Sequence, residues 1–255
     1  MILSATMSAL AFVACDTAEL AAFPPAGSVW HADHETGSES QWPDITTNWD
    51  DAGCKDHRVV DYENSIGQYA MKMTIDQGSL DKAGCRQARL PEAQSGNTYI
   101  YEVSYYLPQK VATLHEMWNV FQYKSTCSGC SGSDPMFTVG FEGNSTPTVH
   151  LNWKGGNYGL AGPFADSGVR PNQQWDSGVA VPFGRWNELS VLLDQSTAFD
   201  GHVTVWFNGV KVFDLADVRT GYDSGDMRWS VNNYSNGLTI DPYTLYIDNA
   251  SIRTP

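Results

Sequence analysis

The chain has 255 residues, with 29 Asp and Glu against 15 Lys and Arg, and therefore a formal net charge of −14. This charge argues against nucleic acid or an anionic membrane as the main partner. The length suits one large β domain. The 9 tryptophans and 12 tyrosines favour surfaces that stack against sugars, although the same rings also fill the cores of β-sandwiches.

The first residues are small and apolar, and they end at Cys15. This run is too short to span a bilayer as a stable helix. It resembles the apolar part of a secretory signal, and the sequence Phe-Val-Ala-Cys at 12–15 approximates a bacterial lipobox. We therefore expect residues 1–25 to direct export. The protein is then either secreted or held at the outer surface as a lipoprotein through Cys15.

Residues 26–255 are predicted to form a single all-β domain. Short runs with period-2 alternation follow one another and are separated by turns, which favours a β-sandwich of two antiparallel sheets. The Asn208-Gly209 pair predicts a type I′ hairpin. Residues 157–182 show little alternation and are expected to form a long surface loop. The predicted strands are 59–62, 69–75, 99–107, 118–124, 136–141, 149–153, 188–193, 203–213 and 243–252.

Four cysteines remain once Cys15 is set aside, an even number in a chain expected to be exported. We predict the disulfides Cys54–Cys85 and Cys127–Cys130. A zinc site is the alternative, because Cys127 and Cys130 form a Cys-x-x-Cys pair. No second pair of cysteines or histidines has metal-ligand spacing, however, which disfavours zinc.

Two strand-like segments carry the residues with the most distinctive chemistry. Alternation in 118–124 places Gln122 and Lys124 on one face, and Tyr234 lies in a second strand-like run, 231–235. An amide, an amine and a phenol on one sheet suit the β-elimination of a uronic-acid polymer, which needs a neutralised carboxylate, a base and an acid. Lys124 is the candidate base if its pKa is lowered, and Tyr234 is the candidate acid, or both base and acid. The alternatives are an exposed lysine, an ordinary sheet amide and a packed tyrosine.

Other polar residues extend this candidate site. Arg86 or Arg89 is expected to neutralise the uronate carboxylate, because a guanidinium binds a carboxylate through two hydrogen bonds; a surface arginine is the alternative for each. His150 is the alternative base, since imidazole titrates near neutrality. It alternates with Asn152 and Lys154 in a polar stripe. The predicted substrate-binding residues are Arg86, Asn119, Asn152, Lys154 and Asn232.

Several motifs in order resemble the jelly-roll polysaccharide lyases of the concanavalin-like superfamily, which include heparin lyase I and the glucuronan, ulvan and alginate lyases. Residues 34–42 resemble their opening motif, and residues 101–108 with 118–124 resemble a characteristic pair of strands. Residues 186–189, 207–209 and 243–249 complete the order. The resemblance implies a jelly roll with a concave groove and cleavage without a cofactor. Alginate lyases of this type carry Gln-x-His where this chain has Gln122-Tyr123-Lys124, so a Lys/Tyr pair like that of ulvan lyases is expected.

In related sugar-binding sandwiches, acidic residues equivalent to Glu35 and Asp248 hold a structural Ca²⁺, which oxygen ligands suit. The sequence as a whole predicts a monomeric, exported polysaccharide lyase that acts on an anionic polysaccharide and needs no protein partner. A non-catalytic carbohydrate-binding module or lectin of the same fold is the alternative. A sandwich glycoside hydrolase is disfavoured, because its paired-carboxylate strand is missing from the sequence.

Overall fold

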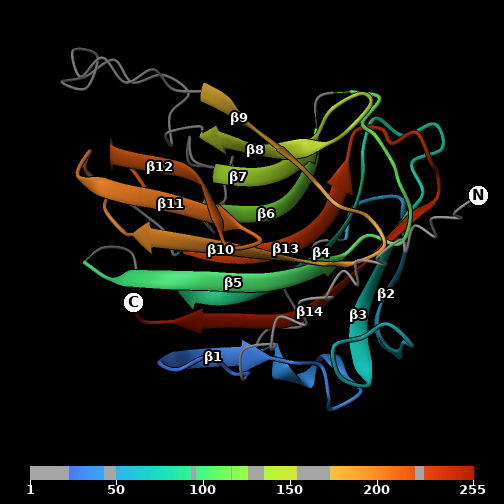
Figure 1. Cartoon of the computed structure of the whole chain (residues 1–255), viewed down its shortest axis with the longest axis horizontal. Coiled ribbons are helices and arrows are strands. Elements are labelled where there is room, and N and C mark those ends of the chain that lie inside the picture. Colours follow the sequence, from blue (N-terminus) through green and yellow to red (C-terminus); the bar gives the residue numbers. More distant parts are fainter. Residues whose placement is uncertain are drawn as a thin grey trace, which may run out of the picture.

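The structure is a computed structural model that describes residues 23–42, 50–92, 96–115, 117–125, 135–153, 173–221 and 227–255, without the side chains of 89–92. Two antiparallel sheets face each other in a β-sandwich, as predicted. Figure 1 shows β12, β11, β10, β5 and β14 one below the other in one sheet, and β9, β8, β7 and β6 in the second. A short 3-10 helix, Glu39–Gln41, also occurs. No helix in the described ranges is long and apolar enough to cross a membrane.

The larger sheet has eight strands. Along one edge of β14, β3 pairs with residues 243–247 and β1 pairs with residues 250–253. The members of this sheet, in spatial order, are β12 (Val210–Val218), β11 (Gly201–Phe207), β10 (Trp186–Asp194), β5 (Thr98–Tyr106), β14 (Tyr243–Arg253), β3 (Tyr69–Ile75) and β2 (Cys54–Asp61), with β1 (Ser28–Ala32) on β14. The smaller sheet has six strands: β4 (Ala83–Glu92), β13 (Met227–Ser235), β6 (Trp118–Ser125), β7 (Pro135–Glu142), β8 (Thr148–Trp153) and β9 (Gln173–Ala180).

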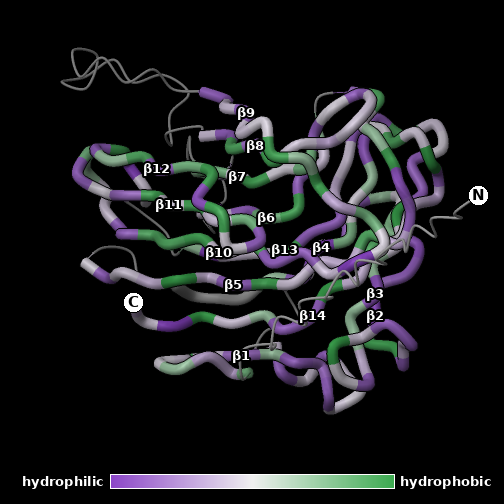
Figure 2. The backbone as a smooth tube through the Cα atoms, in the orientation of Figure 1, coloured by the Kyte–Doolittle hydropathy of each residue, from purple (hydrophilic) through white to green (hydrophobic). Residues whose placement is uncertain are grey.

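The hydrophobic core lies between the sheets and is rich in aromatic rings. Trp118, Tyr105, Phe141 and Trp229 are all fully buried there. Figure 2 shows hydrophobic and hydrophilic residues alternating along many of the strands, which is the pattern of a strand with one face in a core. Since the inner faces supply the core, most polar residues of the six-stranded sheet are directed to its outer face; Asn233 is an exception that donates to the Met73 and Tyr243 carbonyls of the other sheet.

A β-bulge in β6 decides which polar residues share that outer face. The register between β6 and β7 shifts between Asn119 and Phe121, and Val120 and Phe121 both join the core. Residues three apart on a regular strand point to opposite faces. Here the extra residue brings Asn119 and Gln122 to the same face, where their side chains hydrogen-bond at 3.3 Å.

A disulfide joins the two sheets at one edge, which confirms the prediction for Cys54 and Cys85. Cys54 begins β2 in the larger sheet, and Cys85 lies in β4 at the edge of the smaller one. Their Cα atoms are 5.0 Å apart. The bond therefore anchors β4 directly beside Arg86. Cys15, Cys127 and Cys130 lie outside the described residues.

The loop predicted for 157–182 is wrong over its second half. Gln173–Ala180 forms β9, the edge strand of the smaller sheet, whereas 157–172 lie outside the described residues. Exposed and half-buried residues alternate along β9, so this strand lacks the fully buried face of an inner strand. The Asn208-Gly209 hairpin has the positive φ angles of a type I′ turn, 50° and 76°, as predicted.

Candidate active site

A cavity of about 390 Å³ opens on the outer face of the six-stranded sheet. Six residues predicted from the sequence line it together, and they come from β4, β6, β8 and β13. We call it the basic cavity, because three Lys or Arg side chains line it. The lining residues are Lys82, Arg86, Met117, Asn119, Gln122, Lys124, Pro135, Thr138, Glu142, Asn152 and Tyr234.

The strand register aligns these polar residues in rows across the sheet. In one row, Gln122 lies between Ser230 of β13 and Thr138 of β7, and Thr138 lies opposite Asn152 of β8. In the next row, Asn119 lies opposite Tyr234. Neighbouring strands are about 4.8 Å apart, so each row offers a polar group at a short, regular spacing. A polymer lying across the strands would meet these groups in succession.

Tyr234 is held between a glycine and an arginine. Gly84 lies opposite Tyr234 on β4, and a Cβ added to Gly84 would come within 2.4 Å of the Tyr234 ring. On the ring's face, the guanidinium carbon of Arg86 lies 4.1 Å from the ring centroid. Arg86 also forms an ion pair with Asp51. The phenol is thus fixed beside a positive charge that is itself only 10% exposed.

A buried serine and three buried amides form a chain of hydrogen bonds that leads into the cavity. The Ser230 hydroxyl donates to Asn232 Oδ1 at 3.0 Å, Asn232 Nδ2 donates to Asn119 Oδ1 at 3.3 Å, and Asn119 Nδ2 donates to Gln122 Oε1 at 3.3 Å. We call these four residues the amide relay. Every donor points the same way along it, so the relay leaves the amide nitrogen of Gln122, with its two N–H donors, at its end in the cavity.

Asn232, which was predicted to bind substrate, is buried beneath the surface of the cavity. It is 0% exposed and does not line the cavity, so it acts on the site through Asn119. Two cations were missed from the sequence. Lys82 lines the cavity next to β4, and Arg228 lies opposite Lys124 on β13. Arg228 has the same period-2 spacing as Ser230, Asn232 and Tyr234, and this spacing could have predicted that Arg228 lies on the same face.

Comparison with known families decides between an enzyme and a binding module. A family model described as polysaccharide lyase matches residues 34–251, most of the chain. The chain belongs to the polysaccharide lyase family. The enzyme is therefore a lyase that acts on a polysaccharide, as the sequence predicts, and the non-catalytic module of the same fold is the less favoured reading. A comparison with curated proteins found no match.

Solved structures of lyases share the fold. The endo-β-1,4-glucuronan lyase of the fungus Trichoderma reesei aligns with a TM-score of 0.69 at 18% identity, over 89% of this chain and 96% of that one. An alginate lyase from Aplysia kurodai aligns at 0.57 and 14%, over 90% and 100% of the two chains. The alginate lyase vAL-1 from Chlorella virus aligns at 0.55 and 12%, over 80% and 90%. At these identities the likeness concerns the jelly-roll fold, which is the predicted one.

His150 of the lyase is separated from Tyr234. Their rows connect through Asn119 and Gly140, and the two residues lie three strands apart. His150 lines a second cavity instead. Burial lowers the pKa of His150, and the nearby Asp176 carboxylate only partly opposes this effect. The imidazole is therefore neutral at pH 7, but it does not share the basic cavity with Lys124 or Tyr234.

Two of the predicted site residues have side chains that lie outside the described part of the structure. Arg89 lies in β4 in register with Trp229, but its side chain is outside the described residues, as is Lys154. Arg86, the other arginine predicted to neutralise the uronate carboxylate, shares the basic cavity with Gln122 and Lys124.

Glu35 and Asp248 hold a turn of the lyase by hydrogen bonds. The Glu35 carboxylate accepts the backbone N–H groups of Gln68 and Tyr69, and Asp248 accepts those of Ile66 and Asn249. These hydrogen bonds use some of the roughly four lone-pair sites of each carboxylate. Among the described residues, neither carboxylate belongs to a cluster of three potential metal ligands. The structural Ca²⁺ at Glu35 and Asp248 stays a prediction, and no step of the mechanism passes through a metal.

Proposed function

We propose that this lyase cleaves a uronic-acid-containing polysaccharide by β-elimination in the basic cavity. The observation that carries the proposal is the composition of this cavity: a chain with a net charge of −14 gathers Lys82, Arg86 and Lys124 around Gln122 and Tyr234. Elimination needs a neutralised carboxylate, a base for the C5 proton and an acid for the leaving oxygen. The cavity contains a group for each of these tasks.

The carboxylate of the uronate is bound by the end of the amide relay. The two N–H donors of Gln122 hydrogen-bond to its oxygens, and the Arg86 guanidinium adds positive charge nearby. Hydrogen bonds to a charged group are stronger than neutral ones. Because Asn119 fixes the Gln122 oxygen, the amide nitrogen stays turned towards the substrate. The bound carboxylate then withdraws electrons from C5, and its proton becomes more acidic.

Lys124 and Tyr234 move the protons. In its neutral form, the Lys124 amine takes the C5 proton, the C5–H electrons form the C4–C5 double bond, and the C4–O bond breaks. Tyr234 gives its phenolic proton to the leaving oxygen, so that proton and electron counts balance. Both side chains line the same cavity, and they enter it from opposite ends of the β6–β13 pair. A sugar bound between them has one proton acceptor and one proton donor.

An absorbance assay tests this proposal. The purified lyase is incubated with glucuronan, ulvan and alginate, and the unsaturated uronate product is followed by its ultraviolet absorbance. We expect one or more polymers to give product, and Lys124→Ala and Tyr234→Phe each to lose more than 100-fold in kcat. Lys55→Ala in β2 and Tyr62→Phe directly after β2 are matched controls away from the cavity and should keep full turnover. No product from any uronate polymer contradicts the reaction. Near-normal turnover of both site variants contradicts the assigned roles.

Export of the lyase is part of the same proposal. The apolar start of the chain and Cys15 support it. The mature chain is expected to be a monomer that begins at Cys15 or shortly after it. Mass spectrometry of the protein recovered from medium and membranes measures the cleavage site and any lipid. Recovery of the full-length chain from the cytoplasm contradicts export.

A further inference from the structure

A short segment just before β2 holds the outer edge of β4 beside the basic cavity. The backbone N–H of Asp51 donates to the Gly84 carbonyl at 2.8 Å, and the Asp50 carboxylate accepts the backbone N–H of Arg86 at 3.1 Å. Because β4 is an edge strand, these contacts pair backbone groups that no neighbouring strand reaches. Gly84 lies opposite Tyr234, so the segment fixes β4 next to the candidate catalytic tyrosine.

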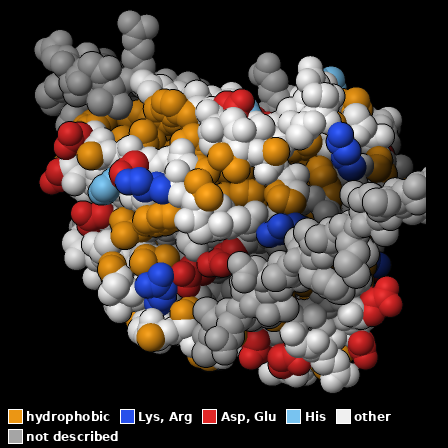
Figure 3. Space-filling view, viewed as in Figure 1, with side chains coloured by type: hydrophobic (Ala, Val, Ile, Leu, Met, Phe, Trp, Pro, Cys, Tyr) orange, Lys and Arg blue, Asp and Glu red, His pale blue; other side chains and the backbone are white. Residues whose placement is uncertain are grey.

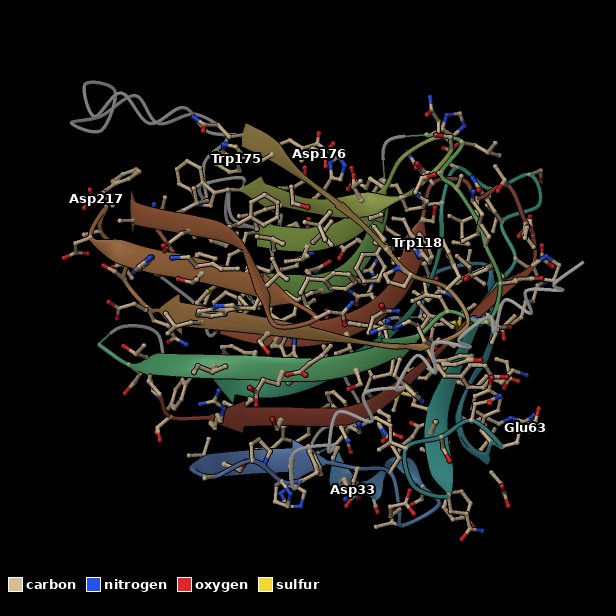
Figure 4. The ribbon with its side chains drawn as sticks, in the orientation of Figure 1. Asp33, Glu63, Trp118, Trp175, Asp176 and Asp217 are labelled. Atoms are coloured by element: carbon tan, nitrogen blue, oxygen red, sulfur yellow. A yellow bond between two sulfur atoms is a disulfide. The ribbon has the colours of Figure 1, made fainter. Side chains whose placement is uncertain are left out.

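Asp51 also holds the side chain of Arg86. Its carboxylate forms an ion pair with the guanidinium, whose central carbon lies 4.1 Å from the centroid of the Tyr234 ring. A Cβ built on Gly84 would lie 2.4 Å from the Tyr234 ring and 3.2 Å from Asp51 Oδ2, so the carboxylate and the ring are close neighbours across the glycine. Figure 4 labels Trp118 at this end of the sheet, in register with the residue that follows Tyr234.

The two contacts of the Arg86 guanidinium use different parts of a planar group. The ion pair with Asp51 is made at Nη2, whereas the Tyr234 ring lies against the face of the group. A guanidinium with one partner at its edge and another on its face has a fixed orientation. Arg86 and Tyr234 line the basic cavity and Asp51 does not, so Asp51 reaches the site through Arg86.

We propose that Asp51 is a positioning residue for the elimination and holds the Arg86 guanidinium flat against Tyr234. The inference rests on the proposed function and deepens it. With Asp51 in place, the guanidinium keeps the phenol directed at the leaving oxygen, and the carboxylate balances part of its charge. Without Asp51, the guanidinium turns away from the ring and offers its whole charge to the uronate. The substrate then binds at least as well, but proton transfer from Tyr234 is misaligned.

Kinetics of Asp51 variants test this role, because misalignment and weaker binding change different parameters. The lyase and its Asp51→Ala, Asp51→Asn and Asp51→Glu variants are assayed on the best uronate polymer, with urea unfolding measured in parallel. Asp51→Ala should lower kcat about 100-fold, and Asp51→Asn, which keeps one oxygen for the guanidinium, about tenfold. KM should not rise in either variant. Asp51→Glu restores the carboxylate and should bring kcat to within about threefold of wild type.

The matched control is Asp76→Asn. The Asp76 side chain is 37% exposed, against 38% for Asp51, and it also forms an ion pair, with Lys55 at 3.5 Å, but it does not line the basic cavity. This variant should keep kcat and KM within about twofold of wild type. Three results overturn the inference: a kcat of Asp51→Ala within about threefold of wild type, a rise in KM as large as the fall in kcat, or no recovery of kcat in Asp51→Glu.

An NMR measurement without substrate separates this inference from the proposed function. The side-chain proton signals of Arg86, assigned with Arg86→Lys, should be shifted upfield in wild type by the ring current of Tyr234. Asp51→Ala should remove most of this shift, whereas Asp51→Glu and Tyr234→Phe should keep it. If no uronate polymer is cleaved but the signals behave in this way, the elimination is wrong and the positioning by Asp51 stands. If elimination occurs and Asp51→Ala leaves the signals unchanged, the positioning is wrong.

Discussion

Replacing Gln122 with glutamate tests the carboxylate-binding role with almost no change of shape. The introduced carboxylate would keep an oxygen to accept the hydrogen bond from Asn119, so the amide relay and the fold should be preserved. The substitution removes the N–H donors and puts a negative charge where the uronate carboxylate binds. Losing a hydrogen bond to a charged group costs about 1.5–3 kcal/mol. Two like charges about 4 Å apart repel by about 4 kcal/mol at an effective dielectric constant of about 20.

These two effects together amount to about 5.5–7 kcal/mol, or a fall in kcat/KM of roughly 10⁴- to 10⁵-fold. The assay is the initial rate of absorbance increase on the best uronate polymer, with the midpoint of urea unfolding measured in parallel. Gln109→Glu adds the same charge at an exposed position and should change kcat/KM less than twofold. A Gln122→Glu enzyme that is folded and within tenfold of wild type would show that the uronate carboxylate lies elsewhere.

Three further substitutions probe the relay, the disulfide and the buried imidazole. Asn232→Ala leaves the Asn119 oxygen without its buried donor, so the free energy of unfolding should fall by about 1–3 kcal/mol. The variant's kcat should fall by a larger factor than its KM rises. An unchanged kcat would limit Asn232 to a structural role. Cys85→Ser opens the bond to Cys54, and the 31-residue separation predicts a loss of about 3.7 kcal/mol in urea unfolding; a loss below about 1 kcal/mol would contradict this. Burial lowers the pKa of His150 in the folded state, so its neutral form stabilises the fold above pH 6.5, and this stability is lost as the pH falls through the lowered pKa. His150→Asn should therefore lose less stability than wild type between pH 7.5 and 5, and equal losses in urea unfolding would argue against that shift.

Alternation in the sequence predicted most of the inner strands and half of the site. It placed 69–75 on the bounds of β3, and Gln122 and Lys124 do share a cavity. Strict alternation fails at Asn119, because the bulge in β6 turns that residue to the face of Gln122. A bulge depends on pairing with the neighbouring strand, so a single strand's sequence does not reveal it.

Edge strands and long-range contacts explain the other differences. β4 and β9 lie at the two edges of the smaller sheet, where a strand needs less apolar sequence. The stack of Arg86 on Tyr234 depends on Gly84, and no local pattern relates a glycine to a tyrosine 150 positions later. The buried end of the relay is invisible for the same reason: Asn232 and Asn119 are 113 residues apart.

The net charge of −14 gives the lyase an unusual expected response to salt. On the face seen in Figure 3, acidic side chains are spread over the surface, with isolated Lys and Arg among them. At about 10 mM salt the Debye length is about 30 Å, so a polyanion approaching the enzyme feels the whole negative chain; at about 100 mM it is about 10 Å. Contacts with Arg86 are short and largely shielded from solvent, and salt weakens them less. We therefore expect kcat/KM to rise between about 10 and 100 mM NaCl and to fall at higher salt, with kcat nearly constant. Initial rates at low and at saturating uronate polymer measure the two parameters. A steady fall in kcat/KM from the lowest salt would mean that the basic cavity attracts the polymer over long range, despite the charge of the chain.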